Sequence, residues 1–433
     1  MSTASGGKLR KIFCEYHQIL FQERPLTIFR YANVRIDAVH FCGEFELGGA
    51  SRKKSRSAGR RARDEGDPAR QRLILFSRTV REQSRLAQRV ITLRIPFTTR
   101  ETCKADLARA VSNLHQLRYV DLPEAVFSSP SSNVLKIELQ AACPELCSLK
   151  FTSGSDATFE MLGQGRLFPR LENITLCDLG VDANVLVLIL VGLPALSTLH
   201  VSGLPQLNDR ALSAGVHLPA LHMLELSHMP HLTVDGMAAY VSRPEVGKML
   251  KRLILSDTAI SVADIYKILN LSENLETLHI TQTVSRPLPF QLPPLVSSSL
   301  KRLHFAISTA SKQSHNMTSP SESYYTYLRN SVLDGHLPSL IHLYALSTGL
   351  PSMLQQQSRH FRPSHPFFLY TKSVAELEWD LTVIDPAAVT STKSETRPLS
   401  LYNPPAPSTF GNQTSLMTDD GFGGEHLSFL IVI

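Results

Sequence analysis

Cysteine is scarce in this 433-residue chain and is not arranged for metal binding. The sequence has no Cys-x-x-Cys pair, and the closest two cysteines, Cys143 and Cys147, have no second pair downstream. Structural zinc sites need two such pairs of ligands, so we expect no zinc. Buried, reduced thiols in a reducing compartment fit this usage best. The six residues are Cys14, Cys42, Cys103, Cys143, Cys147 and Cys177.

Long apolar runs are also missing. The longest, from Val185 to Val191, is too short to cross a bilayer, which takes about 20 helical residues. No apolar stretch follows Lys8, Arg10 and Lys11, so we expect no signal peptide. We therefore expect no membrane partner, and we place the protein in the cytoplasm, the nucleus or both.

Sequence motifs for catalysis are absent as well. The chain has no glycine-rich phosphate loop, no Gly-x-Ser-x-Gly nucleophile elbow and no His-x-x-x-His pair. We therefore expect no catalytic residues, no metal and no cofactor, and a protein that is not an enzyme.

What the chain does have is one leucine pattern, repeated nine times. The first positions of its copies are mostly 25 residues apart, and a fixed period in this range is typical of leucine-rich repeats. The sequence thus predicts an α/β solenoid, shaped like a horseshoe, with an irregular N-terminal segment and a disordered C-terminal tail. The copies have the form Leu-x-x-Leu-x-Leu or a close variant, and they begin at Val90, Leu117, Leu146, Leu171, Leu196, Leu221, Leu250, Leu275 and Leu300.

Composition divides the chain into three parts. Residues 1–73 match no repeat and are predicted to be poorly ordered. Residues 74–385 are predicted to form the repeat domain, interrupted by a polar insertion at 308–321. Residues 386–433 are rich in Pro, Ser and Thr, and we expect them to be disordered.

Four elements outside the regular period are also expected. Leu75, Val80, Leu86 and Val90 recur at near-helical spacing ahead of the first repeat strand. After the insertion, a helix is predicted at Glu322–Leu333, followed by a late repeat at Leu340-x-x-Leu343. Val374-x-x-Leu377-x-Trp379 predicts a last strand.

Within one repeat, the pattern predicts a short strand, a turn and a helix. Leu221, Leu224 and Leu226 alternate so that all three point inward from a strand. Thr233 then follows a turn and can cap a helix. A second helix start is expected at Ser261. No repeat can bury its leucines alone, because each needs a neighbour stacked on either side.

Much of the net charge of +6 comes from one short basic run between Gly49 and Gly66. This run is either a solvated, disordered loop, or a nuclear-import signal or nucleic-acid patch. It lacks interleaved aromatic residues, which argues against reading nucleic acid by stacking. Its basic residues are Arg52, Lys53, Lys54, Arg56, Arg60, Arg61 and Arg63.

Strand residues that flank the inward leucines should face the concave side of a repeat solenoid. They form a polar strip that is either a protein-binding surface or a merely solvated sheet face. Neighbouring strands should also place His279 beside His304, as a functional pair or as two chance surface histidines. The candidate protein-binding residues are Thr175, His200, Glu225, Arg252, His279, Arg302 and His304.

The repeats also resemble a known family. The stretch Leu221–Leu253 is similar to the cysteine-containing leucine-rich repeats of F-box proteins. Its segment Leu232-Thr233-x-Asp235-Gly236-Met237 follows their Leu-Thr-Asp-x-Gly-Leu pattern with the acid shifted by one position. The consensus cysteine is replaced by Leu204, Met229 and Thr258 in successive repeats.

Residues 74–385 are similar more broadly to fungal F-box proteins with divergent repeats. The features that carry this resemblance are a helix at Phe76–Val80, the segment Cys143-Pro144-Glu145-Leu146, the turn Arg243–Val246 and the segment Tyr324-Tyr325-x-Tyr327-Leu328.

The resemblance implies a substrate-recognition subunit of a ubiquitin ligase. In such proteins an F-box docks a Skp-type adaptor and its cullin, and the repeats bind the protein substrate. This chain departs from the family because no Leu-Pro-x-Glu precedes the repeats and the sole tryptophan is Trp379. Residues 9–46 are either the eroded end of an F-box or a misjoined exon. The alternative function is a stand-alone repeat scaffold without ligase coupling.

Overall fold

A computed structural model gives the structure of most of the predicted repeat region. The basic run, residues 9–31 and 37–46, and most of the insertion and the tail lie outside the described residues. Those described are 32–36, 68–95, 101–121, 133–163, 168–213, 218–289, 291–310, 319–355, 365–385, 396–398 and 430–432.

The chain divides into two compact units. The first comprises residues 1–150, 166–171 and 416–433, and the second comprises residues 151–165 and 172–415. In the first unit, parallel strands pair in the order β15, β1, β2, β3 and β4, and α3 and α7 both pack on α5. Its strands are β1 (Asn33–Arg35), β2 (Thr92–Arg94), β3 (Tyr119–Asp121), β4 (Ser148–Phe151) and β15 (Leu430–Val432), and its helices are α3 (Pro68–Glu82), α4 (Ser84–Ala87), α5 (Glu101–Val111) and α7 (Asn133–Ala142).

Strand β1 was not predicted, because it precedes the leucine pattern. It pairs in parallel with β2, and Val34 and Ile36 are buried. The helix expected before the first repeat is present as α3, but its buried face differs from the prediction. Leu75 is exposed, whereas Leu73, Phe76 and Val80 are buried. Both β1 and the start of α3 fall within residues 1–73.

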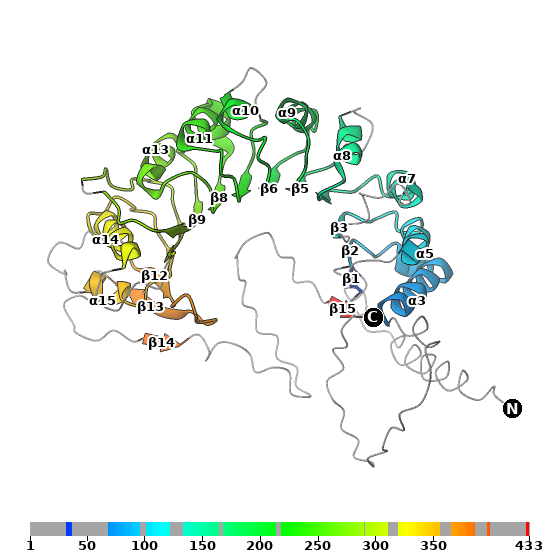
Figure 1. Cartoon of the computed structure of the whole chain (residues 1–433). Coiled ribbons are helices and arrows are strands. Elements are labelled where there is room, and N and C mark those ends of the chain that lie inside the picture. Colours follow the sequence, from blue (N-terminus) through cyan, green and yellow to red (C-terminus); the bar gives the residue numbers. More distant parts are fainter. Residues whose placement is uncertain are drawn as a thin grey trace, which may run out of the picture. The chain divides into compact units, whose positions relative to one another are not determined.

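The second unit is a leucine-rich-repeat solenoid. Its strands pair in parallel in chain order from β5 to β12. Except between β9 and β10, successive strands are joined through a helical segment, and these helices cover one face of the sheet (Figure 1). The strands are β5 (Asn173–Cys177), β6 (Thr198–Ser202), β7 (Met223–Ser227), β8 (Arg252–Ser256), β9 (Thr277–Val284), β10 (Arg302–Thr309), β11 (His342–Ala345) and β12 (Phe367–Thr371).

The helices of this unit are short, and several begin with a side-chain cap. Asp182 caps α9, and Thr233 caps α11 by accepting the amide of Asp235 at 3.3 Å, as predicted. Ser261 caps the 3-10 turn η2 that leads into α13. The helical segments are α8 (Asp156–Leu162), α9 (Ala183–Val191), α10 (Asp209–Ser213), α11 (Val234–Val241), α12 (Pro244–Met249), η2 (Val262–Asp264), α13 (Ile265–Leu271), α14 (Pro320–Leu333) and α15 (Leu350–Gln355).

The core of the second unit is a ladder of aliphatic side chains, one from each strand. Register places them directly opposite one another, and each is 0 % exposed. This explains why the leucine spacing predicts the strands so well, since every strand must deliver its residue to the same layer. The ladder consists of Ile174, Leu199, Leu224, Leu253, Leu278, Leu303, Leu343 and Leu369.

Each of four successive strands, β5 to β8, is followed directly by a residue with left-handed backbone. Asp178, Gly203, His228 and Asp257 have φ between 50° and 65°. Gly, Asp and His tolerate this region better than most residues. The amide of each donates to the carbonyl of the next strand's last residue or, for Asp257, to Thr281, at 2.9–3.1 Å. The turn therefore extends the pairing between repeats.

Helices α10 and α11 approach closely through a glycine. A Cβ added at Gly236 would lie 2.8 Å from Cα of Asp209, closer than real Cβ atoms come to backbone. The Asp209 carboxylate accepts the Thr233 amide at 2.8 Å and its hydroxyl at 2.7 Å. The Thr233–Gly236 segment that carries the family resemblance thus joins adjacent repeats.

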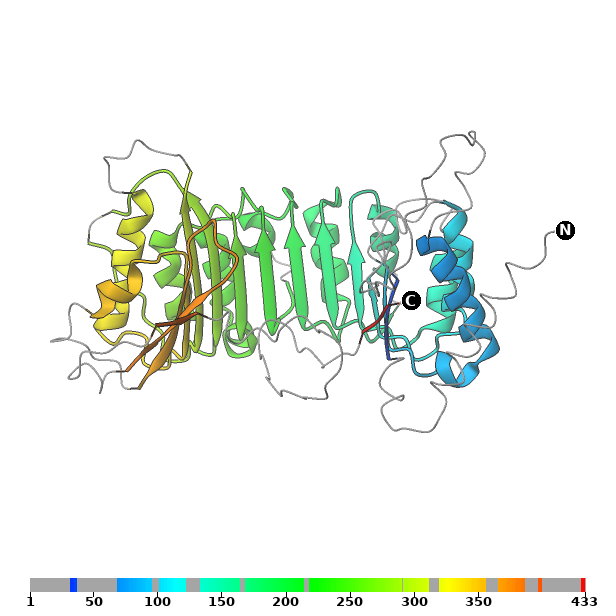
Figure 2. The same cartoon turned by 90° about the horizontal axis from the view of Figure 1, so that it is seen from below.

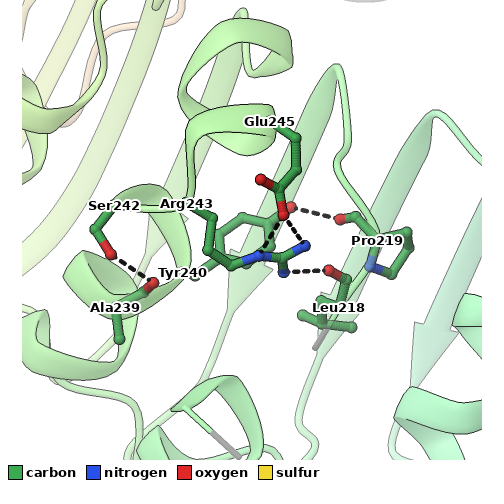
Figure 3. A network of polar contacts seen from close by, with 7 residues as sticks. All are labelled: Leu218, Pro219, Ala239, Tyr240, Ser242, Arg243 and Glu245. Atoms are coloured by element: carbon green, nitrogen blue, oxygen red, sulfur yellow. Dashed lines mark hydrogen bonds and ion pairs between the residues drawn. The ribbon is translucent and has the colours of Figure 1, made fainter. Parts of the chain in front are cut away.

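A second polar link between repeats lies in the Arg243–Val246 turn (Figure 3). Arg243 donates to the Leu218 carbonyl at 2.6 Å and to the Glu245 carboxylate at 2.9 Å. The Tyr240 hydroxyl donates to the Pro219 carbonyl at 2.9 Å, and the tyrosine is fully buried. Burial also raises the pKa of this phenol. The turn therefore satisfies backbone carbonyls of the preceding loop.

Removing the Tyr240 hydroxyl should destabilise the solenoid. In Tyr240→Phe, the Pro219 carbonyl loses its donor in a buried site, which costs about 1–3 kcal/mol. We expect this loss in the free energy of unfolding measured by urea denaturation. Tyr266→Phe, on α13, is the control and should change little. Equal stability of the wild type and Tyr240→Phe would contradict the role of this link.

The C-terminal end of the second unit differs from the prediction. Glu322–Leu333 is helical, within α14, but Val374-x-x-Leu377-x-Trp379 is not a strand. This segment connects β12 to the antiparallel strand β13 (Asp380–Ile384), and Leu377 is 94 % exposed. Strand β14 (Thr396–Pro398) pairs antiparallel with β13. Alternating buried residues in β12, rather than the three-residue leucine spacing, mark the true strand.

Among the described cysteines, none forms a disulfide. Cys143 and Cys147 are buried, as expected, whereas Cys177 is half-buried on β5. The Cys143 thiol donates to the Leu114 carbonyl at 3.5 Å, and burial raises its pKa to about 12. This thiol is therefore protonated and unreactive at neutral pH.

Candidate functional site

Among the residues that the structure describes, no helix lies on one face of the second unit's sheet, and we call this face the strand face (Figure 2). Because strand residues alternate, every second side chain points to this face. Register aligns these side chains in three rows across the strands. The central row is Thr175, His200, Glu225, Ile254, His279, His304, Tyr344 and Tyr370.

The two outer rows differ from each other in chemistry. One is mostly small and polar, and comprises Cys177, Ser202, Ser227, Ser256, Thr281 and Ala306. The other contains two arginines, and comprises Asn173, Thr198, Met223, Arg252, Thr277, Arg302, His342 and Phe368.

All seven candidate residues from the sequence lie on the strand face. Five of them share the central row, whereas Arg252 and Arg302 lie in the arginine-containing row on either side of Thr277. The strip was therefore placed correctly by the repeat period, which fixes both the strand and the side of each residue.

His200 and Glu225 form the polar pair of the central row. The His200 Nδ1 lies 2.7 Å from the Glu225 carboxylate, and both side chains are about 30 % exposed. This hydrogen bond lowers the pKa of Glu225, against the opposing effect of burial. The carboxylate therefore stays ionised and fixed at neutral pH.

Farther along the central row, the side chains form a continuous series of rings. The His279 and His304 ring centroids are 4.9 Å apart, so the predicted pairing is present. His304 stacks on Tyr344 at 3.8 Å, and Tyr344 stacks on Tyr370 at 4.2 Å. We call these four residues the ring series.

The β12–β13 connection adds a fifth ring at the end of the series. Trp379 meets Tyr344 edge-on at 5.5 Å, and the Lys372 ammonium lies 4.6 Å from the indole centroid. Such a contact between a cation and an indole is attractive. Sequence reasoning missed Tyr344, Tyr370 and Trp379 as site residues, although the aromatic-rich run Phe367–Thr371 is typical of a strand, and this strand carries Tyr370.

Burial keeps the histidines of the ring series neutral. It lowers the pKa of His279, and with the nearby His279, Arg302 and His342 it lowers the pKa of His304 to about 3. An uncharged imidazole stacks on a tyrosine without the cost of burying a charge. The ring series is thus apolar in its interior at physiological pH.

This pKa shift predicts that acid destabilises the solenoid. Between pH 6.5 and about 3, the unfolded state binds a proton at His304 that the folded state does not, so stability falls as pH falls. The slope attributable to His304 is at most about 1.4 kcal/mol per pH unit. Urea denaturation at pH 7 and pH 5 should show a smaller pH dependence for His304→Phe than for the wild type. An unchanged dependence would show that His304 titrates normally.

The strand face is rich in side chain types that are common at binding surfaces. Among the described residues, no group of three or more His, Cys, Asp or Glu side chains could hold a metal ion. Within the same part of the chain, no helix is long and apolar enough to cross a membrane. Tyrosine, tryptophan and arginine, by contrast, are the residues enriched at the energetic centres of protein interfaces.

The chain is similar to known proteins at the level of solved structures alone. Neither models of protein families nor curated protein sequences match the chain. Among solved structures, it is similar to one described as the crystal structure of the Rad7 and Elc1 complex in yeast. That match has a TM-score of 0.44 and 15 % identity, and it covers 63 % of this chain and 67 % of that chain.

Proposed function

We propose that the strand face of the second unit binds a protein partner. The ring series carries this proposal, because it sets large aromatic side chains beside arginines on a sheet face that no helix of the described residues covers. Repeat solenoids use such continuous faces for extended contacts with proteins. Binding at this face requires no chemistry from the chain itself.

A single substitution at the strand face tests this proposal. Ala306→Arg places a long charged side chain beside His304, where it should block an approaching surface. In affinity purification from the native cell extract, a partner recovered stoichiometrically with the wild type should be lost with this variant. Ala239→Arg, on α11, is the matched control and should retain the partner. If only the Ala239→Arg variant loses the partner, the binding site lies on the helix-covered face instead.

We further propose that the partner is the substrate of a Skp–cullin–F-box ubiquitin ligase, in the cytoplasm or nucleus. Support comes from the resemblance of the Leu232–Met237 segment to F-box repeat proteins. Its structural counterpart is the close contact between Gly236 and Asp209. The same purification, scored by mass spectrometry, should recover a Skp-type adaptor and a cullin. Recovery of other stoichiometric proteins without them would contradict the ligase role.

A stand-alone interaction scaffold is the second candidate. One observation favours it, because Trp379, the sole tryptophan, packs against Tyr344 on the strand face. F-box proteins carry a tryptophan in the module that docks the adaptor, whereas the tryptophan of this chain lies at the proposed binding face. Recovery of a partner but no adaptor would select this function.

A further inference from the structure

Over strands β5 to β10, charge on the strand face is one-sided. In the three rows of β5 to β10, the only carboxylate is Glu225, and His200 already holds it at 2.7 Å. Arg252 and Arg302 supply two guanidinium groups on the same face. Because complementary charge directs protein association, this imbalance indicates the charge of the occupant.

The two arginines lie close enough to act together. Arg252 on β8 and Arg302 on β10 flank Thr277 on β9, so two strand spacings, about 10 Å, separate their backbones. Both side chains are half-buried, and Arg252 also donates to the Met223 sulfur at 3.9 Å. Burial and the neighbouring Arg302 both lower the pKa of Arg252, so the two charges repel. Thr277 itself is buried, so an anion would have to meet the two guanidinium groups, and binding both would relieve this repulsion.

The ring series begins one row away from these arginines. Arg302 precedes His304 by two residues on the same strand face of β10, and His304 stacks on Tyr344. A ligand that reaches both features must therefore carry negative charge and an apolar or aromatic group a few residues apart. A protein segment can carry both.

We propose that the occupant of the strand face is an acidic segment of a partner protein. One of its carboxylates would bind the guanidinium groups of Arg252 and Arg302, and a neighbouring apolar or aromatic side chain would pack on Tyr344 of the ring series. Arginine suits this role because its planar guanidinium can bind a carboxylate through two parallel hydrogen bonds. This inference rests on the proposed function and adds the chemistry of the partner.

Selection of peptides from a random display library tests the inference with the full chain. The wild type should select peptides enriched in Asp and Glu next to an aromatic or aliphatic residue. The double variant Arg252→Gln, Arg302→Gln should bind these peptides about tenfold to hundredfold more weakly, as expected when charge-assisted hydrogen bonds are lost. The matched control Arg210→Gln, Arg329→Gln, on α10 and α14, should bind them like the wild type.

A second double variant keeps the test independent of folding defects. Arg252→Lys, Arg302→Lys retains both charges, and it should retain the preference for acidic peptides with reduced affinity. Binding of acidic peptides should also weaken steadily as salt rises.

The possible outcomes separate this inference from the proposed function. If the selected peptides are neutral or basic and Ala306→Arg abolishes their binding, the proposal of an acidic partner is overturned. The strand face then remains a binding site. Acidic peptides that bind the Gln double variant as tightly as the wild type would do the same. If no selected peptide is sensitive to Ala306→Arg, or none is selected, both proposals fail.

Discussion

Leu224→Ala should lower the free energy of unfolding by about 2–5 kcal/mol, as large-to-small substitutions in cores do. Leu224 is 0 % exposed and lies opposite Leu199 on one side and Leu253 on the other. The truncation leaves a cavity within the aliphatic ladder, where adjacent repeats cannot collapse without losing strand register. Urea denaturation followed by circular dichroism measures the change.

Leu188→Ala is the matched control for this experiment. Leu188 is on α9 in the same unit but is 57 % exposed, so its truncation should change stability by less than about 0.5 kcal/mol. Comparable losses at the two positions would mean that Leu224 does not lie in a closely packed layer.

Tyr344→Ala should produce the largest loss of binding. Tyr344 contacts three rings, stacking on His304 and Tyr370 and meeting Trp379 edge-on. Aromatic residues at such central positions typically cost at least about 2 kcal/mol of binding energy on truncation, which is about 30-fold in affinity. The dissociation constant of the purified partner, measured by calorimetry, should rise by at least this factor.

Tyr266→Ala on α13 controls for the loss of a tyrosine on the helical side. It should leave the dissociation constant within about twofold of the wild type. Thermal unfolding of both variants separates lost contact from lost fold, because a folded Tyr344→Ala chain must still fail to bind. If Tyr344→Ala binds the partner as tightly as the wild type, the ring series is not part of the interface.

The repeat period was sufficient to predict the solenoid and the side of each strand residue. Leu224 and its counterparts recur because each must enter one layer, and this constraint is visible in the sequence. Once the inward leucines are assigned, the residues between them are assigned to the opposite face. This is why the pairing of His279 with His304 could be predicted from the sequence. The cap at Thr233 followed from local hydrogen bonding.

Beyond β11, the end of the solenoid could not be predicted from the same pattern. The late repeat at Leu340-x-x-Leu343 coincides with β11, although Tyr344 on that strand was not named as a site residue. Strand β12 and its Tyr370 fall outside the leucine spacing. The leucine spacing at Val374–Trp379 matched by chance, while the true strand β12 carries phenylalanines. The ring series depends on contacts across β10, β11 and β12, and strand register must be known before these contacts can be inferred.

Site-specific photo-cross-linking tests the strand face most directly. A photoreactive phenylalanine analogue at Ala306 lies beside the ring series, and the same analogue at Leu188 lies on an exposed part of α9. In the native cell extract, the first position should give one discrete cross-linked partner, and the second should give none. Cross-linking of a discrete partner from Leu188 alone, or from neither position, would contradict binding at the strand face.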